Sequence, residues 1–325
     1  MRRRELIALL AGAALSPRAA LAGDATLPRR LGILSSNTEA AGKALLKCLM
    51  VGLRDHDWIE GKTLALDIRW GGEPGGYPAL AVDLVARKPD LIVTTGTPAT
   101  VAMQHATSDI PVIFVAVSDP VASKIVASIA RPGGNITGVS NFLPATTAKL
   151  LEYLRTIAPA MKRVAVLYDA RNPGKLLEFG ELQAAGKMAG IAVVSAALRA
   201  ANDFAQAFPT ILESHCDGLI TLQDGLTLGN RAGIVSFAAD NRLPAIYQIR
   251  EFADVGGLIS YGLNYCQHYR SAATYVDRIL KGAKPADLPV ELPTSFELVI
   301  NLRAAKALGV DIPPMLIAIA DQVIE

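Results

Sequence analysis

Residues 90–99 read Asp-Leu-Ile-Val-Thr-Thr-Gly-Thr-Pro-Ala and pass from a strand into a helix. The run from Leu91 to Thr94 is typical of a buried strand, because it is apolar without interruption up to the threonine. Thr97 can cap a helix and Pro98 suits its first turn, while Gly96 permits the sharp turn before them. The stretch therefore predicts one strand–helix unit of an α/β sheet.

The same alternation of strand and helix continues along the chain. Strand patterns occupy residues 31–34, 64–70 and 112–117, and helical patterns occupy residues 80–86 and 97–106. Strands that alternate with helices form parallel sheets covered by helices. The first half of the chain therefore predicts one doubly wound lobe.

The second half of the chain repeats the first. Three pairs of segments lie 127 to 133 residues apart, namely Arg30–Leu34 with Arg163–Leu167, Asp90–Val93 with Asp217–Ile220, and Ile110–Val112 with Leu243–Ala245. We therefore predict an α/β fold in which two doubly wound parallel-sheet lobes are joined by a hinge, as in a clamshell. The length of 325 residues also exceeds what one hydrophobic core usually serves.

Glycine and proline mark the points where the chain is expected to cross between the lobes. The first crossing is expected along the strand-like Ile136–Ser140, after the break at Pro132–Asn135, and the others at Gly256-Gly257 and residues 292–296. These breaks assign residues 23–143 and 258–290 to lobe I, and residues 144–257 and 291–325 to lobe II.

The N-terminus has the three parts of a secretory signal peptide. Residues 1–5 are basic, residues 6–15 form an apolar run too short to span a membrane, and residues 20–22 fit a cleavage site. We therefore expect residues 1–22 to be removed near Ala22 and the mature protein to lie in the periplasm. The arginines of the basic part leave the ordinary secretory route and the twin-arginine route both open.

Charge, histidine and cysteine content narrow the function. Without residues 1–22 the chain has 28 basic and 29 acidic side chains, so we expect no nucleic-acid partner. The four histidines lack the spacing of metal ligands, so we expect no metal site. Cys48, Cys216 and Cys266 permit at most one internal disulfide, and Cys48 lies among apolar residues like a buried helix position.

Patterns typical of catalysis are missing from the sequence. It contains no nucleophile elbow, no phosphate-binding loop and no glycine motif for dinucleotides. No histidine lies beside a serine or cysteine that could act as a nucleophile. We therefore predict a binding protein without catalytic residues or cofactors. We also expect it to be a monomer.

Candidate binding residues follow the predicted strands, because ligands of doubly wound sheets bind beyond the carboxyl ends of the strands. They are Ser36, Thr95, Gly96, Thr97 and Ser118 in the first half, and Tyr168, Asp224 and Tyr247 in the second. We expect Thr95–Thr97 to hold a carboxylate and Asp224 to pair with an ammonium group. The alternatives are that Thr97, Asp119 and Asp224 only cap helices, and that the aromatic residues belong to the core. Those aromatic residues are Phe142, Tyr168, Tyr247 and Tyr261.

Several motifs, in order and spacing, resemble one known family over residues 30–325. They are Trp58–Lys62, Thr95–Ala99, Ser118–Val121, Ala130–Ser140, Leu243–Tyr247, Gly256–Gly262, Lys281–Glu291 and Phe296–Leu302. In these segments the chain resembles the substrate-binding proteins of ABC transporters in the tryptophan/tyrosine-type family. The resemblance implies a type 1 periplasmic-binding-protein fold.

The resemblance also implies a function and a ligand class. A small carboxylate-bearing ligand would be captured between the lobes by hinge closure and delivered to an ABC permease driven by a separate ATPase. Amino acids, aromatic ones included, are the expected ligands, and presentation to a sensor instead of a permease is the alternative. By position, the family's ligand contacts correspond to Ser36, Thr95, Gly96, Thr97, Ser118, Asp224 and Tyr247. Two segments, Tyr168–Arg171 and Gln223–Gly225, depart from the family's usual Trp-Asn-Pro-Ala and Pro-Asp patterns.

Overall fold

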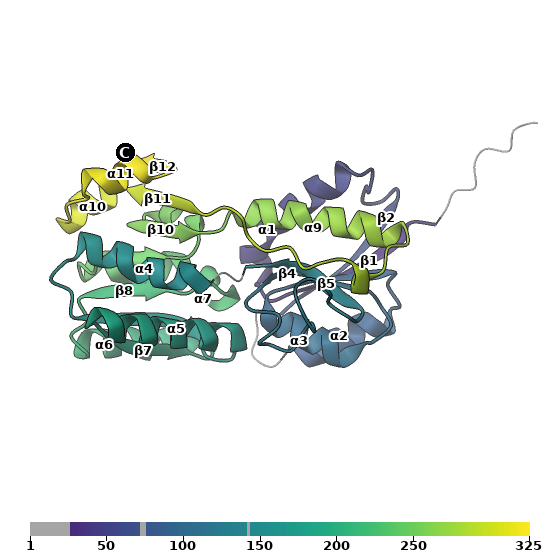
Figure 1. Cartoon of the computed structure of the whole chain (residues 1–325), viewed down its shortest axis with the longest axis horizontal. Coiled ribbons are helices and arrows are strands. Elements are labelled where there is room, and N and C mark those ends of the chain that lie inside the picture. The colour runs from purple at the N-terminus through teal and green to yellow at the C-terminus, as the bar shows by residue number, and fades with distance from the viewer. Residues whose placement is uncertain (1–26, 72–75, 142–143) are drawn as a thin grey trace, which may run out of the picture.

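The computed structural model describes residues 27–71, 76–141 and 144–325, which form two lobes side by side (Figure 1). The predicted signal peptide, residues 1–22, and Phe142 lie outside the described residues. Within the described ranges, no helix has the length and apolar character needed to span a membrane. The same part of the chain holds no group of three or more acidic, histidine or cysteine side chains placed to bind a metal ion.

Lobe I is built on a parallel sheet with the strand order β2-β1-β3-β4-β5. Its strands are β1 (Arg29–Ser35), β2 (Leu64–Trp70), β3 (Leu91–Thr95), β4 (Val112–Val117) and β5 (Ile136–Ser140). Its helices are α1 (Glu39–Arg54), α2 (Tyr77–Ala86), α3 (Thr97–Ala106) and α9 (Tyr265–Leu280), with the short turn η3 (Pro285–Asp287).

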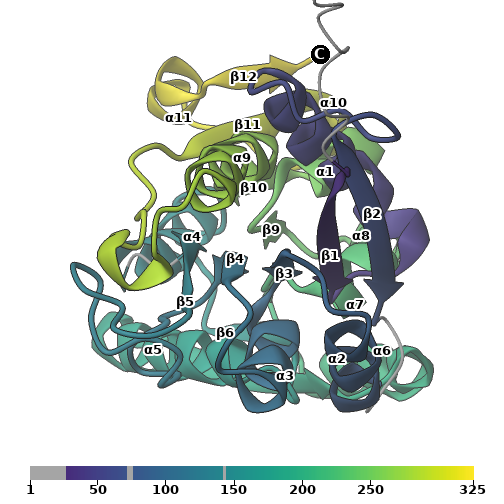
Figure 2. The same cartoon turned by 90° about the vertical axis from the view of Figure 1, so that its right-hand side faces the viewer.

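Alternate residues of each strand face opposite sides of this sheet. Leu31 and Ile33 of β1 belong to the core formed with α1 and α9, whereas Leu34 belongs to the core formed with α2 and α3. Figure 2 shows these two helix pairs on opposite faces of the sheet. The uninterrupted apolar strands of the sequence are therefore strands buried on both faces.

Lobe II contains a longer sheet with the order β12-β11-β10-β9-β8-β6-β7, in which β10 and β11 are antiparallel and the other neighbours are parallel. Its strands are β6 (Arg163–Asp169), β7 (Ala192–Leu198), β8 (Gly218–Thr221), β9 (Ala245–Tyr247), β10 (Ile259–Gly262), β11 (Glu297–Asn301) and β12 (Gln322–Ile324). Its helices are α4 (Pro144–Ile157), α5 (Pro173–Ala189), α6 (Phe204–Glu213), α7 (Gly225–Gly229), α8 (Arg231–Asp240), α10 (Leu302–Leu308) and α11 (Pro314–Ile319), with the short turns η1 (Ala201–Asp203) and η2 (Arg250–Val255). The predicted two-lobed α/β architecture is confirmed.

The crossings between the lobes differ from the predicted boundaries. Strand β10 pairs with β9, so Ile259–Gly262 belongs to lobe II and the crossing expected at Gly256-Gly257 is misplaced. The chain returns to lobe I only where α9 begins. Glu291 forms a bridge with Val139 of β5, so lobe I extends to that residue before the chain crosses back.

A disulfide joins the two helices that cover one face of lobe I. Cys48 of α1 is bonded to Cys266 of α9, while Cys216 is a free, buried thiol. Cys48 is only half-buried and Cys266 is exposed, so the prediction of Cys48 as a buried core residue is wrong. The apolar residues around Cys48 in α1 led to this wrong prediction. Residue 48 lies at the border of the apolar stripe of the helix, where α9 packs.

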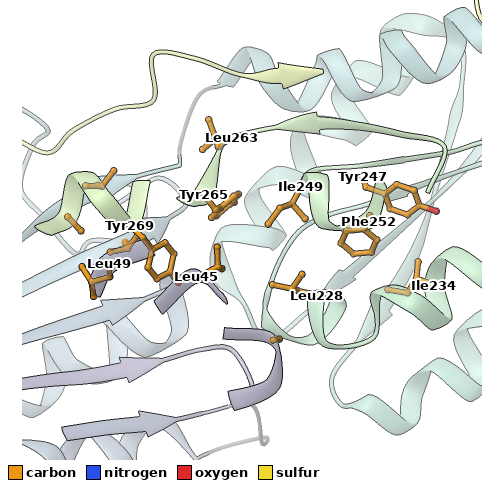
Figure 3. Packing of buried hydrophobic residues seen from close by; sticks show 14 of the residues in the cluster. Leu45, Leu49, Leu228, Ile234, Tyr247, Ile249, Phe252, Leu263, Tyr265 and Tyr269 are labelled. Atoms are coloured by element: carbon orange, nitrogen blue, oxygen red, sulfur yellow. The ribbon is translucent and has the colours of Figure 1, made fainter. Parts of the chain in front are cut away.

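A continuous apolar cluster runs from lobe I into lobe II. Figure 3 shows Leu45 of α1 with Tyr265 and Tyr269 of α9 on one side, and Leu228 and Ile249 of lobe II on the other. All five side chains are buried. The lobes are therefore packed against each other along this side of the molecule.

Candidate ligand site

The carboxyl ends of strands from both lobes meet at one narrow cavity. Lobe I contributes residues after β1, β3 and β4, and lobe II contributes residues at or after β6 and β8. The free volume of the cavity is about 30 Å³, which is enough for water but far too small for an amino acid. In this conformation the cavity has no room for an amino acid.

Five of the eight predicted binding residues line this cavity. They are Ser36, Thr95, Gly96, Ser118 and Asp224. The structure therefore brings together hydroxyl groups from lobe I and a carboxylate from lobe II.

Hydroxyl groups on the lobe I side of the cavity take part in a small hydrogen-bond network. The Thr95 hydroxyl lies 3.0 Å from the Ser35 hydroxyl and accepts a hydrogen bond from the Ser36 backbone N–H. Gly96 follows with φ of 81°, and a Cβ at Gly96 would lie 2.3 Å from the Ser36 Oγ. Both the backbone conformation and the close contact require glycine at this position.

Thr97 acts on the site indirectly. Gly96, not Thr97, is the N-cap of α3, and the Thr97 hydroxyl makes no capping bond, contrary to the prediction. It accepts instead a hydrogen bond of 3.2 Å from the backbone N–H of Ser118. The Ser118 hydroxyl then donates a 2.7 Å hydrogen bond across the cleft to Glu178 of α5. Thr97 thus positions Ser118 without lining the cavity.

Asp224 is both a helix cap and a cavity residue. Its Oδ1 accepts the backbone N–H groups of Leu226 and Thr227 at 2.8 and 2.9 Å, and its Oδ2 accepts that of Asp169 at 2.9 Å. The side chain is 7% exposed and forms no ion pair with any cation in the described residues. Burial, and next the charge of Asp169, raise the pKa of Asp224 to about 6. Lys175 and Arg171 also line the cavity, but they form their ion pairs with Glu178 and Asp169, so Asp224 has no ion pair of its own.

Asp169 differs from Asp224 because it has its own cation. Arg171 Nε lies 2.9 Å from Asp169 Oδ1, and Arg171 Nη2 lies 2.6 Å from Asp169 Oδ2, in a two-pronged ion pair inside the cavity. Neither residue was among the predicted contacts. The alternation of β6 could have identified Asp169, because it is the last strand residue and lies on the face opposite to Tyr168.

The predictions for Tyr168 and Tyr247 are corrected, because neither lines this cavity. Tyr168 shares the face of Val166 and stacks on Phe179, with ring centroids 4.7 Å apart. Tyr247 shares the face of Ala245 and stacks on Phe252 at 4.7 Å. Because alternate residues of a strand face opposite sides of the sheet, both rings point into the core of lobe II and not toward the cavity. Tyr261, the other aromatic candidate of the second half, lines a separate hollow near the crossings.

Three tyrosines of lobe I line the cavity instead. Tyr265 and Tyr269 lie one turn apart on α9, and Tyr77 begins α2. Burial raises the pKa of Tyr269 to about 12, so its hydroxyl stays neutral. The spacing of Tyr265 and Tyr269 places them on one helix face, and residues 258–290 are predicted to belong to lobe I. No sequence pattern, however, marks these two tyrosines as cavity residues.

Asp119 lies outside this cavity and acts as a cap. Its Oδ1 accepts the backbone N–H groups of Val121 and Ala122 at 3.1 and 2.9 Å. The structure therefore favours the capping alternative for Asp119.

Comparison with known proteins agrees with this architecture. Residues 38–324 match the family described as ABC transporter substrate binding protein. A tyrosine-binding protein of Clostridioides difficile (strain R20291) is 27% identical over 263 residues, which is 81% of this chain and 75% of the relative.

Solved structures resemble the whole of the two-lobed fold. An ABC domain from Streptococcus pneumonia in complex with L-Trp is 28% identical, with a TM-score of 0.84 over 91% of this chain and 100% of that chain. A conserved domain protein from Vibrio cholerae is 29% identical, with a TM-score of 0.85 over 91% and 99%. A ligand-free, open substrate-binding protein from Clostridium difficile is 25% identical but has a TM-score of only 0.64 over 91% and 99%.

Proposed function

The chain belongs to the ABC transporter substrate-binding protein family, and we propose that it captures an amino acid between its lobes for an importer. The observation that carries this proposal is Asp224, a buried carboxylate at the cavity that forms no ion pair of its own, since Arg171 and Lys175 are paired with Asp169 and Glu178. A buried charge is costly unless it is paired, so the ligand is expected to supply the missing positive group. The ammonium group of an amino acid has the required charge and hydrogen-bond donors.

The carboxylate of the ligand is assigned to the opposite wall. Hydroxyl groups of Ser36 and Thr95, with the start of α3 behind Gly96, offer donors and the positive end of a helix. A ligand held in this way touches both lobes. Only such a ligand stabilises the closed form, because equal affinity for open and closed forms shifts no population.

The tyrosines of lobe I favour an aromatic or other apolar side chain on the ligand. Tyr77, Tyr265 and Tyr269 provide ring faces with polar tips at the cavity. The relatives named above as tyrosine-binding and as a complex with L-Trp are consistent with this class. Because only about 30 Å³ is free, we expect the Arg171 side chain to shift when the ligand enters.

Hinge closure is the proposed mechanism. The fold resembles the L-Trp complex more closely than the open, ligand-free relative, which supports assigning the conformation described here to a closed form. Capture would proceed from an open form in the periplasm. The loaded protein would then deliver its ligand to a membrane permease powered by a separate ATPase.

Thermal unfolding of the mature protein, residues 23–325, against a panel of amino acids tests the proposal. A ligand at about 1,000 times its Kd adds roughly 4 kcal/mol to the free energy of unfolding, which raises the midpoint by several degrees. We expect the largest shifts from aromatic amino acids. Shifts from sugars alone would contradict the assignment of an amino acid. The protein is denatured and refolded before the assay, so that any ligand retained from the expression host is removed.

A further inference from the structure

A second cavity lies inside lobe II and shares no lining residue with the ligand site. Helices α8 and α10 cover it, and its floor is formed by β9 and the segment that leads into β10. Its free volume is about 140 Å³, several times that of the cavity between the lobes. It opens to solvent near Ala239 and Ala307, which are exposed.

The lining of this cavity is apolar with one exception. Val235, Ala238, Leu258 and Ala304 provide aliphatic surface, and Tyr247 provides a hydroxyl group. An enclosed apolar cavity of about 150 Å³ is known to bind molecules of the size of benzene, so the space here is large enough for one small ring.

Tyr247 presents a polar atom to this cavity without a partner. The residue is 1% exposed, and its hydroxyl makes no hydrogen bond with any described residue. Figure 3 shows the hydroxyl pointing away from Phe252, on which the ring is stacked. Burial alone raises the pKa of Tyr247, so the group stays neutral and can both donate and accept a hydrogen bond. The hydroxyl is therefore available to a molecule that enters this cavity.

We propose that this cavity is a second binding site, which takes a small apolar molecule with one hydrogen-bonding group. The apolar part would fill the space between α8 and α10, and the polar group would pair with the Tyr247 hydroxyl. Phenol satisfies both requirements, and toluene has the same ring without the hydroxyl, so the two serve as matched probes.

Methyl NMR of protein labelled at alanine tests the proposal directly. Phenol titrated to millimolar concentration is expected to shift the methyl signals of Ala238, Ala245 and Ala304. Tyr247→Phe should weaken phenol binding about fivefold, because one neutral hydrogen bond is lost. The same substitution should leave toluene binding unchanged. Ala304→Leu should fill the cavity and abolish binding of both probes.

Two outcomes would overturn this proposal. One is that phenol leaves the three alanine methyl signals of the wild-type protein unmoved. The other is that Tyr247→Phe binds phenol as tightly as the wild type. Amino-acid binding at the site between the lobes serves as the folding control, since neither substituted residue touches that site.

Discussion

Gly225 of lobe II lies against Ser36 of lobe I, so close that a Cβ on the glycine would come within 2.2 Å of the Ser36 carbonyl oxygen. Gly174 of lobe II lies equally close to Ser118 of lobe I, because a Cβ on this glycine would lie 2.5 Å from the Ser118 Cβ. The two lobes thus meet at positions beside the cavity where lobe II has no side chain. Any larger residue would hold the lobes apart, because a backbone oxygen cannot move aside cheaply.

Gly225→Ala is therefore expected to oppose closure. We predict that amino-acid affinity falls at least about tenfold, since the competent closed form becomes a minor population. Calorimetric titration measures the affinity, and small-angle scattering should show that ligand no longer reduces the radius of gyration. Gly233→Ala is the matched control, because a Cβ there meets nothing within 4 Å. Equal affinities for the two variants would show that the contact does not govern closure.

Asp224→Asn removes the charge and can keep the helix cap through its amide oxygen, although its amide NH2 cannot accept the Asp169 N–H that Oδ2 of Asp224 accepts. We expect the loss of a charge-assisted hydrogen bond of about 1.5–3 kcal/mol, or roughly 10- to 150-fold in Kd. Asp119→Asn changes a capping aspartate outside the cavity and should leave the affinity unchanged. Titration of both variants with the same amino acid checks this, and an unaltered Kd in Asp224→Asn would remove Asp224 from the site.

Ligand affinity should rise with pH through the pKa of Asp224. This pKa is about 6, and an ammonium group binds only the ionised carboxylate. We predict about tenfold weaker binding at pH 5 than at pH 7. The charges that face Asp224 are those of Asp169 and Lys175, with Arg171 beside Asp169. In Asp224→Asn the dependence should disappear, and its persistence there would assign it to another group.

The stability of the ligand-free protein should fall with rising pH, whereas ligand affinity should rise. The pKa of Asp224 rises from 3.8 to about 6 on folding, so between these values the folded chain binds more protons than the unfolded one. The free energy of unfolding therefore falls as pH rises from about 4 to 6, by up to about 3 kcal/mol from this group. Urea unfolding of wild type and Asp224→Asn measures the difference. A constant difference between them across this range would contradict the assignment.

The disulfide Cys48–Cys266 should stabilise both the fold and the site. It closes a loop of 218 residues, for which chain entropy gives about 5 kcal/mol as an upper figure. It also ties α1, which carries Leu45, to α9, which carries Tyr265 and Tyr269. We expect Cys48→Ser with Cys266→Ser to lower the melting temperature and weaken amino-acid binding. Reductant should affect only the wild-type protein, and an unchanged melting temperature on reduction would refute the role.

Sequence patterns predicted the fold because buried parallel strands are apolar on both faces and helix starts have distinct residues. Thr95, Gly96 and Asp224 could be placed at the site because strand ends of doubly wound sheets share one edge. Successive residues of a strand face opposite sides of the sheet, which explains the error at Tyr168. Tyr168 packs in the core, whereas the next residue of β6, Asp169, lines the cavity. The return of residues 258–290 to lobe I was predicted, but the tyrosines of α9 were not predicted as cavity residues, because they follow no strand end of the sheet.

Calorimetric titration with L-tyrosine and two of its analogues tests the central claim most directly. Tyramine lacks the carboxylate, and 3-(4-hydroxyphenyl)propionate lacks the ammonium group. If another amino acid gives the largest thermal shift, its own amine and deaminated analogues replace these. We predict that the intact amino acid binds and that each analogue binds at least about tenfold more weakly, since each loses contact with one lobe. Binding of the ammonium-free analogue as tight as that of the amino acid would contradict the role of Asp224 and the account built on it.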